Sequence, residues 1–171
     1  GVMSKYLQLI NQRTTESIAV KRALLESQSH AIANVGEALV EAMRNGKTLF
    51  LFGNGGSAGD SQHIAAELVG RFTKERRALP AVALTTNSSA LTALGNDYEY
   101  AIVFSRQLEA FGKAGDIAIG ISTSGNSPNV LHGLETAKNL GMVTVGLTGE
   151  TGGKIKEMAD HCICVPSRDT A

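Results

Sequence analysis

The 171-residue sequence has no tryptophan, only three prolines and only two cysteines. Two cysteines are too few for a disulfide-rich secreted scaffold. Cys162 and Cys164 stand two positions apart, so on a strand they face the same side at a spacing too long for a comfortable disulfide. We therefore expect two packed free thiols, as in a protein of the reducing cytoplasm.

The sequence also has no excess charge of either sign and no long apolar run. Sixteen basic side chains balance sixteen acidic ones, so the composition gives no indication of a nucleic-acid or membrane surface. No apolar stretch approaches the roughly 20 residues of a transmembrane helix, and we expect no secretory signal. With 43% hydrophobic residues, we expect one domain, residues 1–171, that buries a sizeable core.

Apolar runs and helical periodicities alternate along most of the chain. Two helices are predicted first, at 4–26 and 30–44, and the apolar residues of the former suggest packing against something narrow, such as another subunit; these residues are Tyr6, Leu7, Ile10, Ile18 and Leu25. Strands are then predicted at 48–52, 81–85, 116–121, 142–147 and 161–165, and helices at 58–70, 88–95, 99–111, 127–140 and 153–159. This alternation predicts an α/β core, about 47–166, with a parallel sheet covered on both faces.

The stretch GNGGSAGDSQHIAAELVGR, residues 53–71, follows the first predicted strand. Glycines at its start allow a tight turn and a close approach of a ligand to the backbone. Ala58–Val69 has good helix formers, so the loop ends at a helix N-terminus, which suits an anion. One turn further on, His63 and Glu67 share a helix face.

The same glycines permit a second interpretation, because Gly53-x-Gly55-x-x-Ala58 satisfies a dinucleotide-binding fingerprint. That interpretation expects an acidic residue after the next strand, to bind a ribose. The predicted strand Ala81–Thr85 instead runs into Thr86-Asn87-Ser88. No G-K-[ST] follows the glycines either, so a P-loop is excluded.

After the third predicted strand comes Ser122-Thr123-Ser124-Gly125-Asn126-Ser127-Pro128. Ser127 is predicted to be a helix N-cap and Pro128 the first helical residue. Hydroxyls, a glycine and a helix N-terminus converge there without lysine or arginine, which is how a neutral loop binds a phosphate monoester. The alternative is an ordinary serine-rich turn, but a second anion-suited loop at the same sheet edge favours phosphate.

Three other features have structural as well as functional interpretations. His63 and Glu67 are either a solvated surface pair, two ligands of a metal such as zinc, or, for Glu67, a base that removes a proton next to a carbonyl. Asn96-Asp97 is by itself a plain helix break. The segment 148–153 is expected to be a structural turn that leads into the next helix.

Four motifs together resemble the sugar isomerase (SIS) domain family, and more narrowly its phosphoheptose isomerases: GNGGSAGDSQHIAAEL, GND at 95–97, ISTSGNS at 121–127 and LTGETGGK at 147–154. The resemblance covers nearly the whole chain. It implies a flavodoxin-like sheet of five parallel strands and a homotetramer with active sites at subunit interfaces. It also implies conversion of sedoheptulose 7-phosphate to D-glycero-D-manno-heptose 7-phosphate through an enediol, in heptose and lipopolysaccharide synthesis.

The resemblance also implies roles for particular residues. Glu67 is implied to be the base that forms the enediol and, with His63, a ligand of one zinc ion per subunit. These two roles conflict, because a metal-bound carboxylate is a weaker base, and we rank the base first. The implied phosphate-binding residues are Ser122, Thr123, Ser124 and Ser127; those lining the sugar site are Asn54, Gly55, Gly56 and Ser57; and Asn96 and Asp97 contact substrate.

In the family, a further helix with the pattern R-I-Q-E-x-H follows the V-P-S segment. Its Gln and His complete the metal site, and the His also serves as the general acid. The sequence stops at Ala171, so we expect residues 1–171 alone to be inactive. The alternatives are SIS-fold proteins without catalysis, namely a module that associates with the replication initiator and a sugar-phosphate sensor. Glu67 favours the enzyme, because the initiator-associating members have a small residue there.

Overall fold

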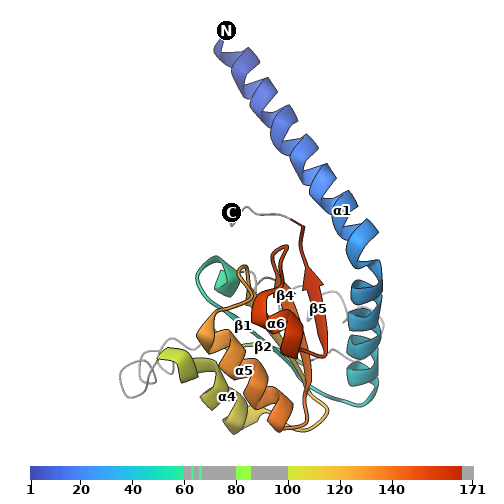
Figure 1. Ribbon diagram of the computed structural model, residues 1–171, viewed down its shortest axis with the longest axis vertical. Coiled ribbons are helices and arrows are strands. Elements are labelled where there is room, and N and C mark those ends of the chain that lie inside the picture. Colours follow the sequence, from blue (N-terminus) through green and yellow to red (C-terminus); the bar gives the residue numbers. More distant parts are fainter. Residues whose placement is uncertain (60–62, 64–65, 67–79, 86–99, 167–171) are drawn as a thin grey trace.

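The computed structural model describes residues 1–59, 63, 66, 80–85 and 100–166 (Figure 1). Its elements are α1 (Val2–Arg44), β1 (Leu49–Gly53), β2 (Ala81–Ala83), the 3-10 helix η1 (Tyr100–Ile102), α4 (Val103–Phe111), β3 (Ile117–Ser122), α5 (Pro128–Asn139), β4 (Val143–Thr148), α6 (Gly153–Met158) and β5 (His161–Cys164). Residues 56–59, 63 and 66 are also helical. All the predicted strands are present, whereas the predicted helix 88–95 lies outside the described residues.

The strands form a parallel sheet in the order β2-β1-β3-β4-β5. This order confirms the predicted flavodoxin-like fold. The chain passes from β1 outward to β2 in one direction and from β3 outward to β4 and β5 in the other. Sheets of this kind bind ligands where the strand order reverses, beyond the carboxyl ends of the strands. The fold therefore predicts a ligand site at the carboxyl ends of β1 and β3.

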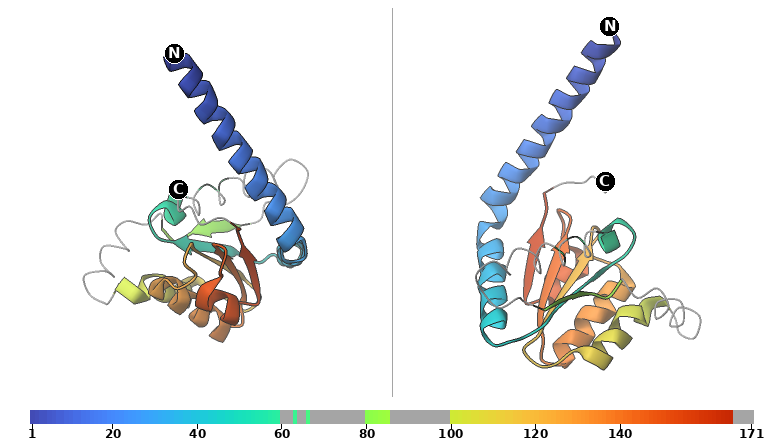
Figure 2. Two further views of the ribbon diagram at one scale, coloured as in Figure 1. Left: turned by 45° about the horizontal axis from the view of Figure 1, so that its top comes forward. Right: turned by 180° about the vertical axis from the view of Figure 1, so that it is seen from behind.

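Helices cover both faces of the sheet, with α1 on one side and α4, α5 and α6 on the other (Figure 2). Successive residues of β1 alternate between the two layers, as the pleat requires. Leu49 and Leu51 pack in the cluster that includes residues of α1, while Phe50 and Phe52 pack in the cluster that includes α4 and α5. The ring of Phe52 lies 5.2 Å from that of Phe104, centroid to centroid. A strand buried on both faces explains the continuous apolar run that predicted β1.

The prediction of two N-terminal helices is wrong, because α1 is one helix of 43 residues. The expected break at 27–29 contains no glycine or proline. Instead, the Ser27 hydroxyl donates to the Ala23 carbonyl at 2.7 Å within the helix. Gln28 Oε1 accepts the backbone N–H of Cys164 at 3.0 Å, which ties this part of α1 to the edge strand β5. The helix therefore continues through the predicted break.

Both cysteines of β5 are free, as predicted, and their sulfur atoms lie 3.8 Å apart. Burial, with the neighbouring Cys164 as the next cause, raises the pKa of the Cys162 thiol to about 11. The thiol is therefore protonated at neutral pH. Within the described part of the chain, no helix combines the length and the apolar character needed to cross a bilayer.

Candidate functional site

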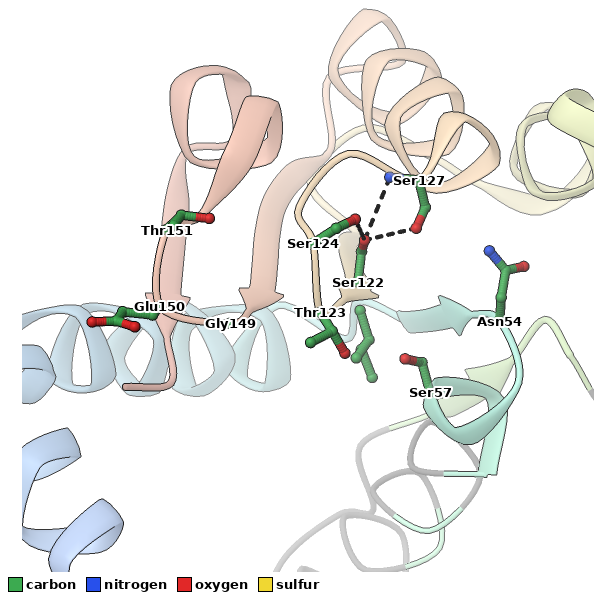
Figure 3. Close-up of a pocket in the computed structure, with 10 residues that line it drawn as sticks. Asn54, Ser57, Ser122, Thr123, Ser124, Ser127, Gly149, Glu150 and Thr151 are labelled. Atoms are coloured by element: carbon green, nitrogen blue, oxygen red, sulfur yellow. Dashed lines mark hydrogen bonds between the residues drawn. The ribbon is translucent and has the colours of Figure 1, made fainter. Parts of the chain in front are cut away.

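A cavity of about 730 Å³ opens beyond the carboxyl ends of β1, β3 and β4 (Figure 3). It lies where the strand order reverses, which is the position that the fold predicts for a ligand. Three loops and the end of β3 supply its wall. The described residues that line it are Asn54, Ser57, Ile121, Ser122, Thr123, Ser124, Ser127, Gly149, Glu150 and Thr151.

The loop after β3 brings two serine hydroxyls, those of Ser124 and Ser127, to Ser122 at the end of β3. The Ser122 Oγ lies 2.7 Å from the Ser127 Oγ and 3.4 Å from the Ser124 Oγ, and it accepts the Ser127 backbone N–H at 3.4 Å. Ser122 is buried, so these neighbours fix the position of its hydroxyl. Each hydroxyl can donate one hydrogen bond and accept two, so the cluster can direct protons toward an anion in the cavity.

Helix α5 begins beside these hydroxyls. Ser127 is its N-cap residue and Pro128 its first residue, as predicted. The Ser127 side chain makes no capping hydrogen bond, because its hydroxyl is turned toward Ser122. The positive end of the helix dipole therefore adds to the hydroxyl donors at one point of the cavity wall.

The glycine loop after β1 forms the opposite wall, and Figure 3 shows Asn54 and Ser57 facing the serine loop. Gly55 has a φ of +53°, a conformation that glycine adopts without strain. The Ser57 N–H donates to the Asn54 carbonyl at 2.9 Å, which closes the turn before the helical residues 56–59. Gly55 and Gly56 shape this turn, but they are not among the lining residues.

Of the remaining predicted site residues, the structure describes only His63. His63 is helical and exposed. Glu67, Asn96 and Asp97 lie outside the described residues, so their roles stay predictions. Within the described ranges, no three histidine, cysteine or acidic side chains gather as a metal-binding group would.

The loop after β4 contributes Gly149, Glu150 and Thr151 to the cavity wall, and the sequence analysis missed them. The predicted turn does lead into α6, but it also lies against the serine loop, where the Gly149 N–H donates to the Thr123 carbonyl at 2.8 Å. The signal for this lies in the strand order rather than in the segment itself. The segment follows a strand next to β3 in the sheet, and such strands end at the same edge.

The described part of the cavity wall carries little charge. Among the lining residues that the structure describes, Glu150 is the only ionisable one, and none is lysine or arginine. Figure 3 shows the Glu150 carboxylate directed away from the serine cluster. On the described part of the wall, an anion therefore meets hydroxyls, backbone N–H groups and a helix N-terminus.

Comparisons with known proteins agree with this geometry. A family model described as SIS domain matches residues 14–149. Among curated relatives, the phosphoheptose isomerase of Aquifex aeolicus is 52% identical over 164 residues, which are 96% of this chain and 86% of the relative. The phosphoheptose isomerase of Roseiflexus sp. is 55% identical over 155 residues, which are 91% of this chain and 79% of the relative.

Solved structures give the same result. A phosphoheptose isomerase from Neisseria gonorrhoeae superposes with a TM-score of 0.87 at 40% identity, over 96% of this chain and 88% of that one. One from Francisella tularensis superposes with a TM-score of 0.88 at 36% identity, over the same shares of the two chains.

Proposed function

The chain belongs to the SIS domain family and, within it, to the phosphoheptose isomerases, and on that premise we propose that it converts sedoheptulose 7-phosphate to D-glycero-D-manno-heptose 7-phosphate. The observation that carries this proposal is the cavity, in which serine hydroxyls and the start of α5 face Asn54 and Ser57. Such a wall suits a phosphate at one end and sugar hydroxyls at the other. The product is a heptose of the kind used for lipopolysaccharide or related surface glycans.

The site residues follow from this proposal. Ser122, Thr123, Ser124 and Ser127 bind the phosphate, Asn54, Gly55, Gly56 and Ser57 line the sugar site, and Asn96 and Asp97 contact the substrate. The phosphate anchors the sugar, so its carbon chain extends from the serine loop toward the glycine loop. Holding the reacting carbons in place in this way removes much of the entropic part of the barrier.

Glu67 is proposed as the base. It takes the proton from C1 of the ketose, the C–H electron pair becomes the C1=C2 bond, and the former C2=O π pair accepts a proton at O2 from a general acid, which gives the enediol. Return of the first proton to C2 then gives the aldose, while the O1 hydroxyl returns its proton to the general acid and O1 becomes the carbonyl oxygen. A carboxylate performs this step well when a partly desolvated pocket raises its pKa toward neutrality.

We also propose one zinc ion per subunit, held in part by His63 and Glu67, which stand four residues apart. Of these two, only His63 belongs to the described residues, and they contain no complete set of ligands. Further ligands must come from other residues, and the family resemblance implies a Gln and a His. When bound, zinc would act as a Lewis acid on the substrate oxygens. The steps above do not depend on it.

A homotetramer with active sites at subunit interfaces is proposed for the assembly, and a cytoplasmic location is proposed from the free cysteines. The N-terminal half of α1 extends beyond the α/β core (Figure 1). It exposes Tyr6, Leu7 and Ile10 by 61%, 56% and 59%. Apolar residues gathered on one projecting helix are typical of a protein–protein contact.

The substitution Ile10→Glu should therefore lower the mass of the assembly, because each copy would place a carboxylate in the apolar contact. Light scattering after size exclusion measures this mass. Gln8→Glu adds the same charge at an exposed polar position of the same helix and should leave the mass unchanged. A wild-type protein that is monomeric at micromolar concentration would contradict the proposed assembly.

The test of the function is a coupled isomerase assay on the full-length protein with sedoheptulose 7-phosphate. Turnover would support the isomerase. If the wild-type protein shows no turnover, with or without added zinc, the isomerase proposal is wrong. A non-catalytic SIS protein, either a replication-initiator partner or a sugar-phosphate sensor, would then take its place.

Ser122→Ala should raise KM on the order of 10-fold, because the substrate phosphate loses a hydroxyl network whose bonds to a charged group contribute about 1.5–3 kcal/mol each. Steady-state kinetics measure the change. Ser105→Ala is the matched control, since Ser105 is also buried and its hydroxyl bonds the Ile102 carbonyl at 3.1 Å, within the helical segment η1–α4. The serine cluster is not the phosphate site if both variants have the same KM.

A further inference from the structure

We propose that Asn129, in the first turn of α5, is a positioning residue that holds the Asn54 side chain at the cavity wall and so couples the glycine loop to the serine loop. This inference rests on the proposed function for its kinetic consequences. Asn129 does not line the cavity, and no motif in the sequence marks it. Its role follows from the hydrogen bonds that it makes.

The two asparagine side chains bond each other reciprocally. Asn54 Nδ2 donates to Asn129 Oδ1 at 2.8 Å, and Asn129 Nδ2 donates to Asn54 Oδ1 at 2.6 Å. Asn129 is only 3% exposed, so water does not compete for its amide. Breaking either bond would leave a buried polar group without its partner. The free-energy cost of this is larger than that of losing a hydrogen bond at an exposed position.

The backbone of α5 fixes which way this pair is oriented. The Val130 N–H donates to Asn129 Oδ1 at 2.9 Å, so the oxygen of Asn129 must lie toward Val130. The amide nitrogen of Asn129 therefore donates to Asn54, and Asn54 can match it in only one orientation. One N–H of Asn54 then remains for a ligand in the cavity. A sugar hydroxyl is the group that such a donor would bind.

Asn129 also explains why Ser127 is available to the cavity. A serine at the N-cap ordinarily accepts a backbone N–H from the second or third residue of its helix. Val130 is that third residue, and its N–H is already bound by Asn129 Oδ1. The Ser127 hydroxyl is thereby released to bond Ser122 in the serine cluster. One buried amide thus arranges donors on both walls.

The substitution Asn129→Asp separates the orientation of Asn54 from the release of the Ser127 hydroxyl. An aspartate keeps an oxygen for the Val130 N–H and suits the positive end of a helix dipole. It loses the N–H that Asn54 Oδ1 accepts and places a second oxygen against that atom. We expect kcat/KM for sedoheptulose 7-phosphate to fall by about 100-fold, as for other misplaced binding groups. Asn139→Asp, at the exposed end of the same helix, should leave it unchanged.

A double-mutant cycle tests whether the effect passes through Asn54. In an Asn54→Ala background, Asn129→Asp should change kcat/KM by less than about 3-fold, because the group that it positions is gone. If the 100-fold loss persists there, Asn129 acts independently of Asn54 and the proposal is wrong. No loss from Asn129→Asp in the otherwise wild-type protein overturns it equally.

Hydrogen exchange separates this inference from the proposed function, because it needs no substrate. The backbone amides of residues 53–59 should exchange about 10-fold faster in Asn129→Asp than in the wild type, while Asn139→Asp leaves them unchanged. Equal exchange in both variants would overturn the inference even for an active isomerase. Faster exchange in Asn129→Asp supports it even if the wild-type protein fails the isomerase assay.

Discussion

Replacing Glu67 with glutamine should lower kcat on the order of 10³-fold, the typical contribution of a positioned general base. Glutamine has nearly the shape of glutamate but cannot take the proton from C1, so the enediol no longer forms at a useful rate. The proposed phosphate-binding groups are the hydroxyls of the serine cluster around Ser122, which this substitution leaves in place, so phosphate binding should survive. The measurements are kcat in the coupled assay and the inhibition constant of inorganic phosphate.

Glu150 is the alternative candidate for the base, since it is the ionisable residue among the described lining residues. Its carboxylate points away from the serine cluster, and we expect Glu150→Gln to retain most of the turnover (Figure 3). If Glu150→Gln abolishes turnover while Glu67→Gln does not, the base has been misassigned. If Glu67→Gln loses phosphate binding together with kcat, the variant has disturbed the site as a whole and the test fails to support a base.

The centre of the sheet could be predicted from sequence because β1 and β3 are short, mainly apolar runs that are buried along their whole length. In β1, Phe50 and Phe52 face one helical layer and Leu49 and Leu51 face the other. Burial on both faces therefore makes consecutive residues of this strand apolar, and that run is visible in the sequence. The helix break predicted at Ser27-Gln28-Ser29 is wrong, because the cause of the helix's continuity is not local. What keeps α1 continuous there includes a contact of Gln28 with the distant strand β5, which no local pattern contains.

The site also has a part that the sequence predicts and a part that it does not. Ser122, Ser124 and Ser127 lie in one loop, so their convergence is local and the sequence predicts it. The cavity wall at Gly149–Thr151 and the pair between Asn54 and Asn129 depend on which strands are neighbours. Asn54 and Asn129 are 75 residues apart in the chain, and nothing in either segment indicates the other. Such contacts follow from the strand order and can be identified only once that order is known.

Gly125→Ala should be the most disruptive single change in the serine loop. Gly125 has a φ of +70°, and a Cβ there would collide with the carbonyl group of Gly152 in the loop after β4. The serine loop is also joined to α6, whose Ile155 N–H donates to the Gly125 carbonyl at 3.0 Å. We expect the free energy of unfolding to fall by roughly 3 kcal/mol or more, and phosphate binding to be lost.

Gly46→Ala isolates the part of this effect that comes from packing. Gly46 has nearly the same φ, +65°, but nothing lies within 4 Å of the position of its Cβ. Its substitution should cost only the left-handed backbone strain, about 1–2 kcal/mol, and leave phosphate binding intact. Denaturant unfolding of both variants gives the comparison. If Gly125→Ala costs no more than Gly46→Ala, the two loops do not make the close contact described. A larger cost together with lost binding would mean that this contact holds the serine hydroxyls in place, because a defect confined to stability leaves the affinity of the folded fraction unchanged.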